Sequence, residues 1–360
     1  MNDMRQMIAD TAARIFRDHC DGDLIAAAEA GFWPAELWQI LEENGLTRAA
    51  VAEEMGGAGG NLGDAMTLVR EAGRAAVPLP LAESFLAGWL LEGAGLEVPE
   101  GPLTVAPVGP ADALFIEQAA GGWILNGNAT IPWGAQAGHI AVIAESEAGD
   151  QVALVEVRRT RTTGGQNLAG EPRDAVIFDN IVLPADDVRP AGNQVSRAGL
   201  FRLGALARSV QIAGALDAVL AMTLAYVGDR VQFGRPLAKF QAVQQQLAVL
   251  AGQVAAAGRA ADWAVVAVEV GEGPEAAETE VAIAVAKART GEAAGIAAEI
   301  CHQLHGAIGF TREYSLQHLS RRLWAWRDEF GPEVVWQLRL GRLAAKSGPD
   351  GLWPFITGIG

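Results

Sequence analysis

Apolar residues near the start of the chain recur at helical spacing. Met4, Met7, Ile8, Ala12 and Ile15 follow one another at steps that gather them on one face of a helix. The chain up to about position 95 is therefore predicted to be helical. Further helices are expected around 37–41 before a stop at Gly45, from Asn61 or Leu62 to 72 before Pro78 and Pro80, and over 81–91.

Between Val98 and Pro190 the pattern changes to short β-prone runs separated by Gly, Pro, Asn and Asp. Such runs are typical of a compact antiparallel sheet or barrel. The pair Asn126-Gly127 is expected to form a turn at the end of its strand. The predicted strands cover 103–105, 114–117, 123–125, 140–144, 152–156, 175–178 and 181–183.

From about Ser196 the apolar pattern becomes helical again, in longer runs. Four or five helices joined by short links predict a bundle. The fold class is therefore mainly α with a central β domain, and 360 residues are enough for two or three packed units. The expected helices cover 200–228, 237–270, 276–304, 316–326 and 332–345, and the expected domains are 1–98 (helical), 99–192 (β-barrel) and 193–360 (helical bundle).

Composition agrees with a folded chain, since half of the residues are apolar and 19% are charged. The formal net charge is −16. A field of that sign repels phosphates at long range, so we expect no nucleic-acid partner. Any polyanionic ligand must be held by a local cationic pocket.

The two cysteines, Cys20 and Cys301, lie far apart and neither belongs to a C-x-x-C pair, which favours a reduced, cytoplasmic setting without a metal site. The N-terminus has no apolar core of a secretory signal. The apolar stretch from Ser209 to Gly228 is long enough to span a bilayer. Because Asp217 interrupts it, we expect a buried core helix and no membrane.

Two local sequences carry candidate chemistry. In the first, 229–237, Gly234 permits a tight turn, Pro236 is expected to start a helix, and Arg230 with Gln232 present a guanidinium and an amide. This corner either holds a pyrophosphate and an adjacent polar ring or simply joins two helices. In the second, 303–314, Gln303 precedes two glycines that either admit a bulky ligand or end a helix before a loop.

Together the two sequences resemble the acyl-CoA dehydrogenase family. The first reads R-x-Q-F-G-x-P-L-x-x-F-Q-x-x-Q, and about 60 residues later the second reads Q-x-x-G-x-x-G-F-T-x-E-Y. VAEEMGGAGG at 51–60 and FDNIVLP at 178–184 extend the resemblance to essentially the whole chain. It implies a helical domain, a β-barrel and a four-helix bundle, in the order that periodicity predicts.

The resemblance also implies FAD as cofactor, an acyl-CoA substrate, an oligomer, and an electron-transfer flavoprotein or similar acceptor. In the family, the bundle of a neighbouring subunit closes over the pyrophosphate and adenine of the flavin. An arginine suits this contact even in an acidic protein, because its fork pairs with phosphate oxygens. The implied cofactor-binding residues are Arg230, Gln232, Phe233, Gln303, Gly306 and Gly309.

The implied reaction is α,β-dehydrogenation, in which a carboxylate takes the α-proton and a hydride leaves to the flavin. The position of the family's catalytic glutamate falls on Phe330, before Gly331, and the other familiar position falls on Gly204 or Ala205. None of these is a carboxylate.

Glu329 stands next to Phe330, and a one-residue slip would make it the catalytic base. Alternatively, Asp328 and Glu329 are solvated acids or partners for Arg321, Arg322 and Arg327. The tryptophans at 324, 326 and 336 either restrict the acyl pocket or pack in the core.

The flavin-facing β segments depart from the family as well. Residues 105–112 lack the Thr-Glu and Gly-Ser pairs of "T-E-P-x-x-G-S-D", and 125–133 shift the Trp of the next strand to Trp133. Pro132 also removes a ladder donor. The chain thus keeps the half of the site that serves a neighbour's flavin and loses the half that binds its own.

This half-site resembles the smaller subunits of heteromeric acyl-CoA dehydrogenases, found in bacterial degradation of steroid side chains and of dicarboxylic or aromatic acyl-CoAs. The leading hypothesis is an obligate subunit of such a complex. A second is a stand-alone homo-oligomeric dehydrogenase that uses Glu329 or Asp328. A third is a non-catalytic acyl-CoA-binding or assembly subunit.

Overall fold

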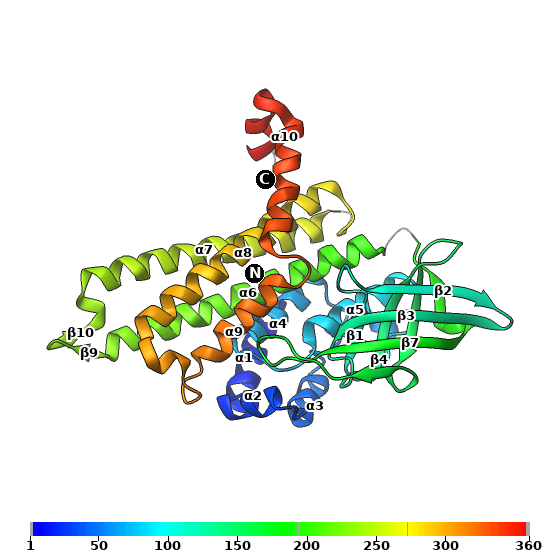
Figure 1. Ribbon diagram of the computed structural model, residues 1–360, viewed down its shortest axis with the longest axis horizontal. Helices are drawn as coiled ribbons and strands as arrows, with labels where there is room; N and C mark the ends of the chain where they lie inside the picture. Colours follow the sequence, from blue (N-terminus) through cyan, green and yellow to red (C-terminus); the bar gives the residue numbers. More distant parts are fainter. Residues whose placement is uncertain (1–2, 193–194, 272, 358–360) are drawn as a thin grey trace. The chain divides into compact units, whose positions relative to one another are not determined.

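A computed structural model describes residues 3–192, 195–271 and 273–357, and Figure 1 shows helices, then a β region, then helices along the chain. This order is the predicted one. The chain divides into two compact units, 1–69 with 78–204 and 272–275, and 70–77 with 205–271 and 276–360. The three domains expected from the sequence stay a prediction.

The first helix buries fewer of its apolar residues than their spacing predicts. Ala12, Ile15 and Phe16 are buried in the first helix, whereas Met4 and Met7 are more than half exposed. A short helix at 22–29 was not predicted, because eight residues give little periodicity; Asp21 starts it by accepting a hydrogen bond from the Leu24 amide at 2.8 Å. The helices are α1 (Asp3–His19), α2 (Gly22–Glu29), α3 (Ala35–Glu43), η1 (Glu53–Met55), α4 (Leu62–Arg74) and α5 (Leu81–Gly93).

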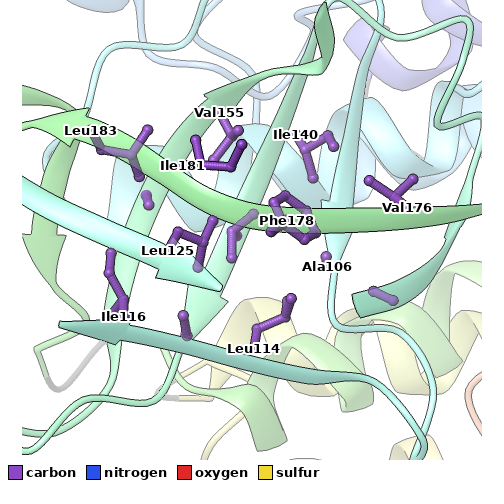
Figure 2. Packing of buried hydrophobic residues seen from close by; sticks show 14 of the residues in the cluster. Ala106, Leu114, Ile116, Leu125, Ile140, Val155, Val176, Phe178, Ile181 and Leu183 are labelled. Atoms are coloured by element: carbon purple, nitrogen blue, oxygen red, sulfur yellow. The ribbon is translucent and has the colours of Figure 1, made fainter. Parts of the chain in front are cut away.

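The predicted barrel takes the form of two four-stranded sheets, ordered β1-β4-β5-β8 and β2-β3-β7-β6. They are joined where the Ile116 amide donates to the Glu145 carbonyl at 2.8 Å. Figure 2 shows side chains of both sheets, among them Leu125, Ile140 and Phe178, gathered in one buried core. The strands are β1 (Leu103–Ala106), β2 (Ala113–Ala119), β3 (Gly122–Pro132), β4 (His139–Ala144), β5 (Gln151–Glu156), β6 (Arg161–Thr163), β7 (Arg173–Pro184) and β8 (Val188–Pro190).

The prediction of a turn at Asn126-Gly127 was wrong. Gly127 lies inside β3 with φ +133°, and the pairing register shifts between Leu125 and Gly127. A side chain there would meet the Ala113 carbonyl at 2.0 Å, so the glycine allows the close approach of β2. Opposite it, Asn180 has φ +51° within the single strand β7, where two strands were expected.

The bundle places β9 (Val231–Gln232) and β10 (Arg235–Pro236) at one end of its long helices (Figure 1). Pro236 pairs with Val231 in extended conformation and is followed directly by a 3-10 helix at Leu237–Lys239, whereas the next α-helix begins only at Gln241. The helices are α6 (Arg197–Asp229), η4 (Leu237–Lys239), α7 (Gln241–Val270), α8 (Ala277–His305), η5 (Gly306–Phe310), α9 (Leu316–Asp328) and α10 (Glu333–Thr357), the last interrupted at Gly348.

By length and composition α6 could cross a membrane, which is weak support for a span, because core helices pass the same test. Its Asp217 accepts from Arg70 at 3.1 Å and from Arg74 at 2.9 Å. Arg70 also pairs with Asp262 of α7 at 2.6 Å. These ion pairs tie α6 to the last turn of α4 and support the core-helix interpretation.

Candidate functional site

A two-residue hairpin follows the end of α6 and positions the first candidate sequence. Gln232 pairs with Arg235, and the loop residues Phe233 and Gly234 have φ +51° and +79°, the left-handed pair that a tight hairpin needs. The Arg230 carbonyl accepts from the Leu237 amide at 2.9 Å and closes the base of the loop. The Phe233 ring stands 92% exposed at the tip.

The two arginines of this hairpin differ in their contacts. The Arg235 guanidinium lies 4.1 Å from the centre of the Phe240 ring, a cation–π contact. Within the ranges that the structure describes, no hydrogen bond or ion pair engages the side chains of Arg230 or Gln232. Arg230 therefore offers an uncommitted cation in an acidic protein.

The second candidate sequence forms the end of α8. Gln303 is exposed there, and its amide has no partner among the described residues. Gly306 ends the helix at φ +66° with open space around it. Gly309 is buried: a side chain there would lie 3.1 Å from the His305 Cβ and 3.2 Å from the His302 Nδ1. Packing alone accounts for Gly309, while Gly306 and Gln303 face open surroundings.

The two candidate sequences meet at the same end of the bundle. The Tyr226 ring, just before Arg230, stacks on His305 with centroids 4.4 Å apart, and its hydroxyl donates to the His305 carbonyl at 3.2 Å. The Tyr314 hydroxyl lies 3.2 Å from the His305 Nε2. Burial lowers the pKa of His305, which favours the neutral form of the ring. Neither residue was predicted to contribute to the site, although Tyr226 lies just before the first candidate sequence and His305 lies within the second.

The turn after α9 carries the candidate base. Glu329 Oε2 accepts a hydrogen bond from Arg208 Nε of α6 at 2.7 Å, and Arg208 is only 2% exposed. The Glu329 side chain is 19% exposed, so it is not a freely solvated acid, whereas Asp328 is exposed. Phe330 follows at φ +51° and is buried. The ion-pair partner Arg208 was not anticipated.

A buried lysine supports the same turn. Lys287 of α8 donates from Nζ to the Arg327 carbonyl at 2.6 Å and to the Trp326 carbonyl at 3.4 Å, so it caps the end of α9. Burial lowers the pKa of Lys287 to about 7, although the Glu329 charge acts in the opposite direction. No sequence signal distinguished this lysine from a surface one.

We expect Lys287→Met to remove a pH-dependent part of the stability. Burial lowers the Lys287 pKa from 10.5 to about 7, so between these values the unfolded chain binds a proton that the folded chain lacks. The wild type should therefore gain stability over the variant as pH rises from 7 towards 10, by up to about 1.4 kcal/mol per pH unit. Urea unfolding of both proteins at pH 7, 8 and 9 measures this difference; parallel pH profiles would contradict it.

The β segments expected to face the chain's own flavin are committed to internal contacts. The Asp112 carboxylate accepts from the amides of Val108 and Gly109 at 2.8 Å each and from Thr130 at 2.9 Å. Trp133 is buried, with its ring edge-on to Trp33 at 6.4 Å between centroids. Asp112 and Trp133 are thus engaged in contacts within the β region and with Trp33, whereas Arg230, Gln232 and Gln303 at the bundle end are exposed.

Two of the three tryptophans considered for the acyl pocket belong to the core. Trp326 and Trp336 are almost completely buried, and the Trp336 indole donates to the Phe330 carbonyl at 3.0 Å. Trp324 is partly exposed and stacks on His302 at 6.0 Å between ring centroids. A search of the described residues finds no group of three or more His, Cys, Asp or Glu side chains arranged to hold a metal ion.

Comparison with known proteins gives matches at both ends of the chain. A family model described as the acyl-CoA dehydrogenase C-terminal domain matches residues 191–337, and the corresponding N-terminal domain model matches 2–97. The acyl-CoA dehydrogenase IpdE2 of Mycolicibacterium smegmatis is 28% identical over 339 residues, covering 92% of this chain and 96% of the relative.

Two further relatives cover most of the chain. The acyl-CoA dehydrogenase FadE28 of Mycobacterium tuberculosis is 30% identical over 301 residues, which is 78% of this chain and 84% of that protein. The crystallised Tcur3481-Tcur3483 steroid ACAD superposes with a TM-score of 0.83 at 27% identity and covers 95% of this chain and 98% of that chain. The fold is therefore shared along nearly the whole length.

Proposed function

Because this chain belongs to the acyl-CoA dehydrogenase family, we propose that it acts as a subunit of a heteromeric acyl-CoA dehydrogenase and completes the FAD site of a partner chain. The proposal is based on a difference between the two groups of residues that the family resemblance places at flavins. At the bundle end, Arg230, Gln232 and Gln303 are exposed and uncommitted, whereas Asp112 closes the β loop expected to hold the chain's own flavin.

Each exposed group has a role at the partner's cofactor. The Arg230 fork pairs with pyrophosphate oxygens, and its uncommitted state means that no internal ion pair has to break first. The Phe233 ring, 92% exposed, supplies a face for the adenine. The amides of Gln232 and Gln303 supply donors and acceptors, and Gly306, which has open space around it, lets the ligand approach the main chain. Bound FAD supplies the hydride acceptor.

The catalytic carboxylate belongs to the partner chain in this proposal. Phe330 occupies the position where the family resemblance expects the base, and Glu329 is already paired with Arg208. A second candidate function, a stand-alone homo-oligomer, is favoured by the 19% exposure of the Glu329 side chain, which leaves a carboxylate one residue from the expected place. A non-catalytic acyl-CoA-binding or assembly subunit is the third.

The remaining assignments follow from the family and its relatives. The substrate is an acyl-CoA, and the steroid ACAD among the similar structures supports a bulky acyl group. An electron-transfer flavoprotein or similar acceptor reoxidises the flavin, and the complex works in the cytoplasm. The net charge of −16 disfavours nucleic acid as a partner.

Arg230→Ala should weaken FAD retention in the complex by about 10- to 100-fold, because a charge-assisted contact to phosphate contributes on the order of 1.5–3 kcal/mol. Arg235→Ala is the matched control, since this arginine lies in the same hairpin but rests on Phe240. Flavin absorbance per chain after gel filtration measures retention. Equal FAD content in the two variants would refute the Arg230 assignment.

A further inference from the structure

Two buried cations converge on the turn that follows α9. Arg208 comes from α6 and Lys287 from α8, and both side chains are almost completely buried. Arg208 contacts the Glu329 side chain, while Lys287 contacts the main-chain carbonyls of residues 326 and 327. The turn is thus held by Lys287 through the main chain of the residues just before it, and by Arg208 through the Glu329 side chain within it.

A buried guanidinium needs a counter-ion, because an unpaired charge away from water is strongly unfavourable. Besides Glu329, the carboxylates nearest to this turn are Asp328 and Glu333. Asp328 is exposed, and Glu333 accepts from Arg327 at 2.9 Å. Glu329 Oε2 lies 2.7 Å from the Arg208 Nε, and the Gln211 amide oxygen accepts from the Arg208 Nη1. Glu329 is therefore the carboxylate placed to neutralise Arg208.

The ion pair with Arg208 makes Glu329 less suited to act as a catalytic base. A carboxylate that takes up a proton gives up its charge, and an arginine at hydrogen-bond distance stabilises the charged form. Proton uptake by Glu329 would remove the charge that faces the buried Arg208 guanidinium at 2.7 Å. The backbone of the turn is also constrained, because Phe330 has a left-handed conformation at φ +51°. The centre of its ring lies 6.0 Å from the guanidinium carbon of Arg208, so Arg208 contacts both Glu329 and the residue after it.

We propose that Glu329 is a positioning residue: its carboxylate is the counter-ion of buried Arg208, and together with Lys287 this pair fixes the turn from Asp328 to Gly331. The inference rests on the proposed function, because it assigns the proton-accepting carboxylate to the partner chain. It also gives Glu329 a role in a chain that carries Phe330 where the family resemblance expects the catalytic glutamate.

The test uses Glu329→Gln, Arg208→Met and the double variant, each co-expressed with a complete homologue. A counter-ion role predicts non-additivity: Glu329→Gln lowers the melting temperature by on the order of 5–10 °C, and adding Arg208→Met restores part of the loss, because both charges are then gone. Turnover per bound flavin should stay within about twofold of wild type. Glu329→Asp, which keeps the charge, should lose less stability than Glu329→Gln.

The pH dependence of stability is a second measurement, and it distinguishes loss of the Glu329 charge from loss of side-chain packing. The groups that act on the Lys287 titration are Glu329, Arg208, Glu333 and Asp328, and the Glu329 charge raises the Lys287 pKa. Glu329→Gln should therefore move the pH dependence contributed by Lys287 to lower pH, whereas loss of packing alone would leave it in place.

Three outcomes would overturn the inference. They are turnover that falls at least 100-fold in Glu329→Gln at unchanged melting temperature, melting temperatures that add in the double variant, and Glu329→Asp as unstable as Glu329→Gln. If the wild-type chain assembles with no homologue, the proposed function fails by itself. The melting temperatures of the chain alone then still test the counter-ion role.

Discussion

Expressed alone, the chain should purify with little or no FAD and without acyl-CoA oxidation. Co-expression with a homologue that keeps the complete flavin loop and the catalytic glutamate should yield a yellow, active complex. The reason is that this chain offers Arg230, Gln232 and Phe233 to a flavin, but its own β loop is closed by Asp112. Turnover with an artificial electron acceptor should rise by at least about 100-fold on assembly, the minimum that a positioned base contributes.

Two results would contradict this expectation in different ways. A yellow homo-oligomer that oxidises acyl-CoA without a second chain would support the stand-alone enzyme and restore Glu329 as the leading base. Tight acyl-CoA binding without flavin, alone and with every homologue tried, would support the non-catalytic binding subunit.

Gly214→Ala should destabilise the protein by about 3 kcal/mol or more, a large effect for one methyl group. A side chain at this position of α6 would lie 2.0 Å from the Arg70 carbonyl, so the backbones of α6 and the last turn of α4 would have to separate. That movement would also disturb the Arg70–Asp217 ion pair. Gly73→Ala should act similarly, because its side chain would meet the Gln211 carbonyl at 2.2 Å.

Gly252→Ala is the matched control for this prediction. Gly252 lies within α7, is exposed, and has nothing within 4 Å of the position of an added side chain. Alanine there should stabilise the helix by about 0.5–1 kcal/mol. Urea unfolding compares the variants; equal stability of Gly214→Ala and Gly252→Ala would rule out the close helix crossing.

Much of the fold could be predicted because the regular spacing of apolar residues along a long helix can be recognised from neighbouring positions in the sequence. The helices α6, α7 and α8 lie within a few residues of their expected ranges, and the strands β1, β2, β4 and β5 do so as well. In contrast, β3 is much longer than predicted, and β7 is one strand where two were expected. The predictions of secondary structure failed where the conformation depends on pairing with residues that are distant in sequence. Asn126-Gly127 has the composition of a turn, but regular pairing with β2 keeps both residues within β3, opposite an irregularity in β7. Strands β6 and β8, with three residues each, are too short to show a period.

The same limit applies to the candidate site: local motifs can be recognised in the sequence, whereas contacts between distant residues cannot. The family motifs predict roles for Arg230 and Gln303, which lie at the ends of long helices. It did not identify the partner of Glu329, because Arg208 is 121 positions away and belongs to another helix. The contact between Tyr226 and His305 likewise joins residues 79 positions apart. Such pairs form only through packing of the bundle, which no local pattern encodes.

The central claim is that this chain completes a flavin site which another chain mainly forms. Native mass spectrometry of the co-expressed complex tests it most directly, because it counts chains and flavins in the same particle. We expect one FAD for each pair of unlike chains, and loss of that FAD when Arg230→Ala is introduced into this chain alone. One FAD for every chain, unaffected by Arg230→Ala, would contradict it.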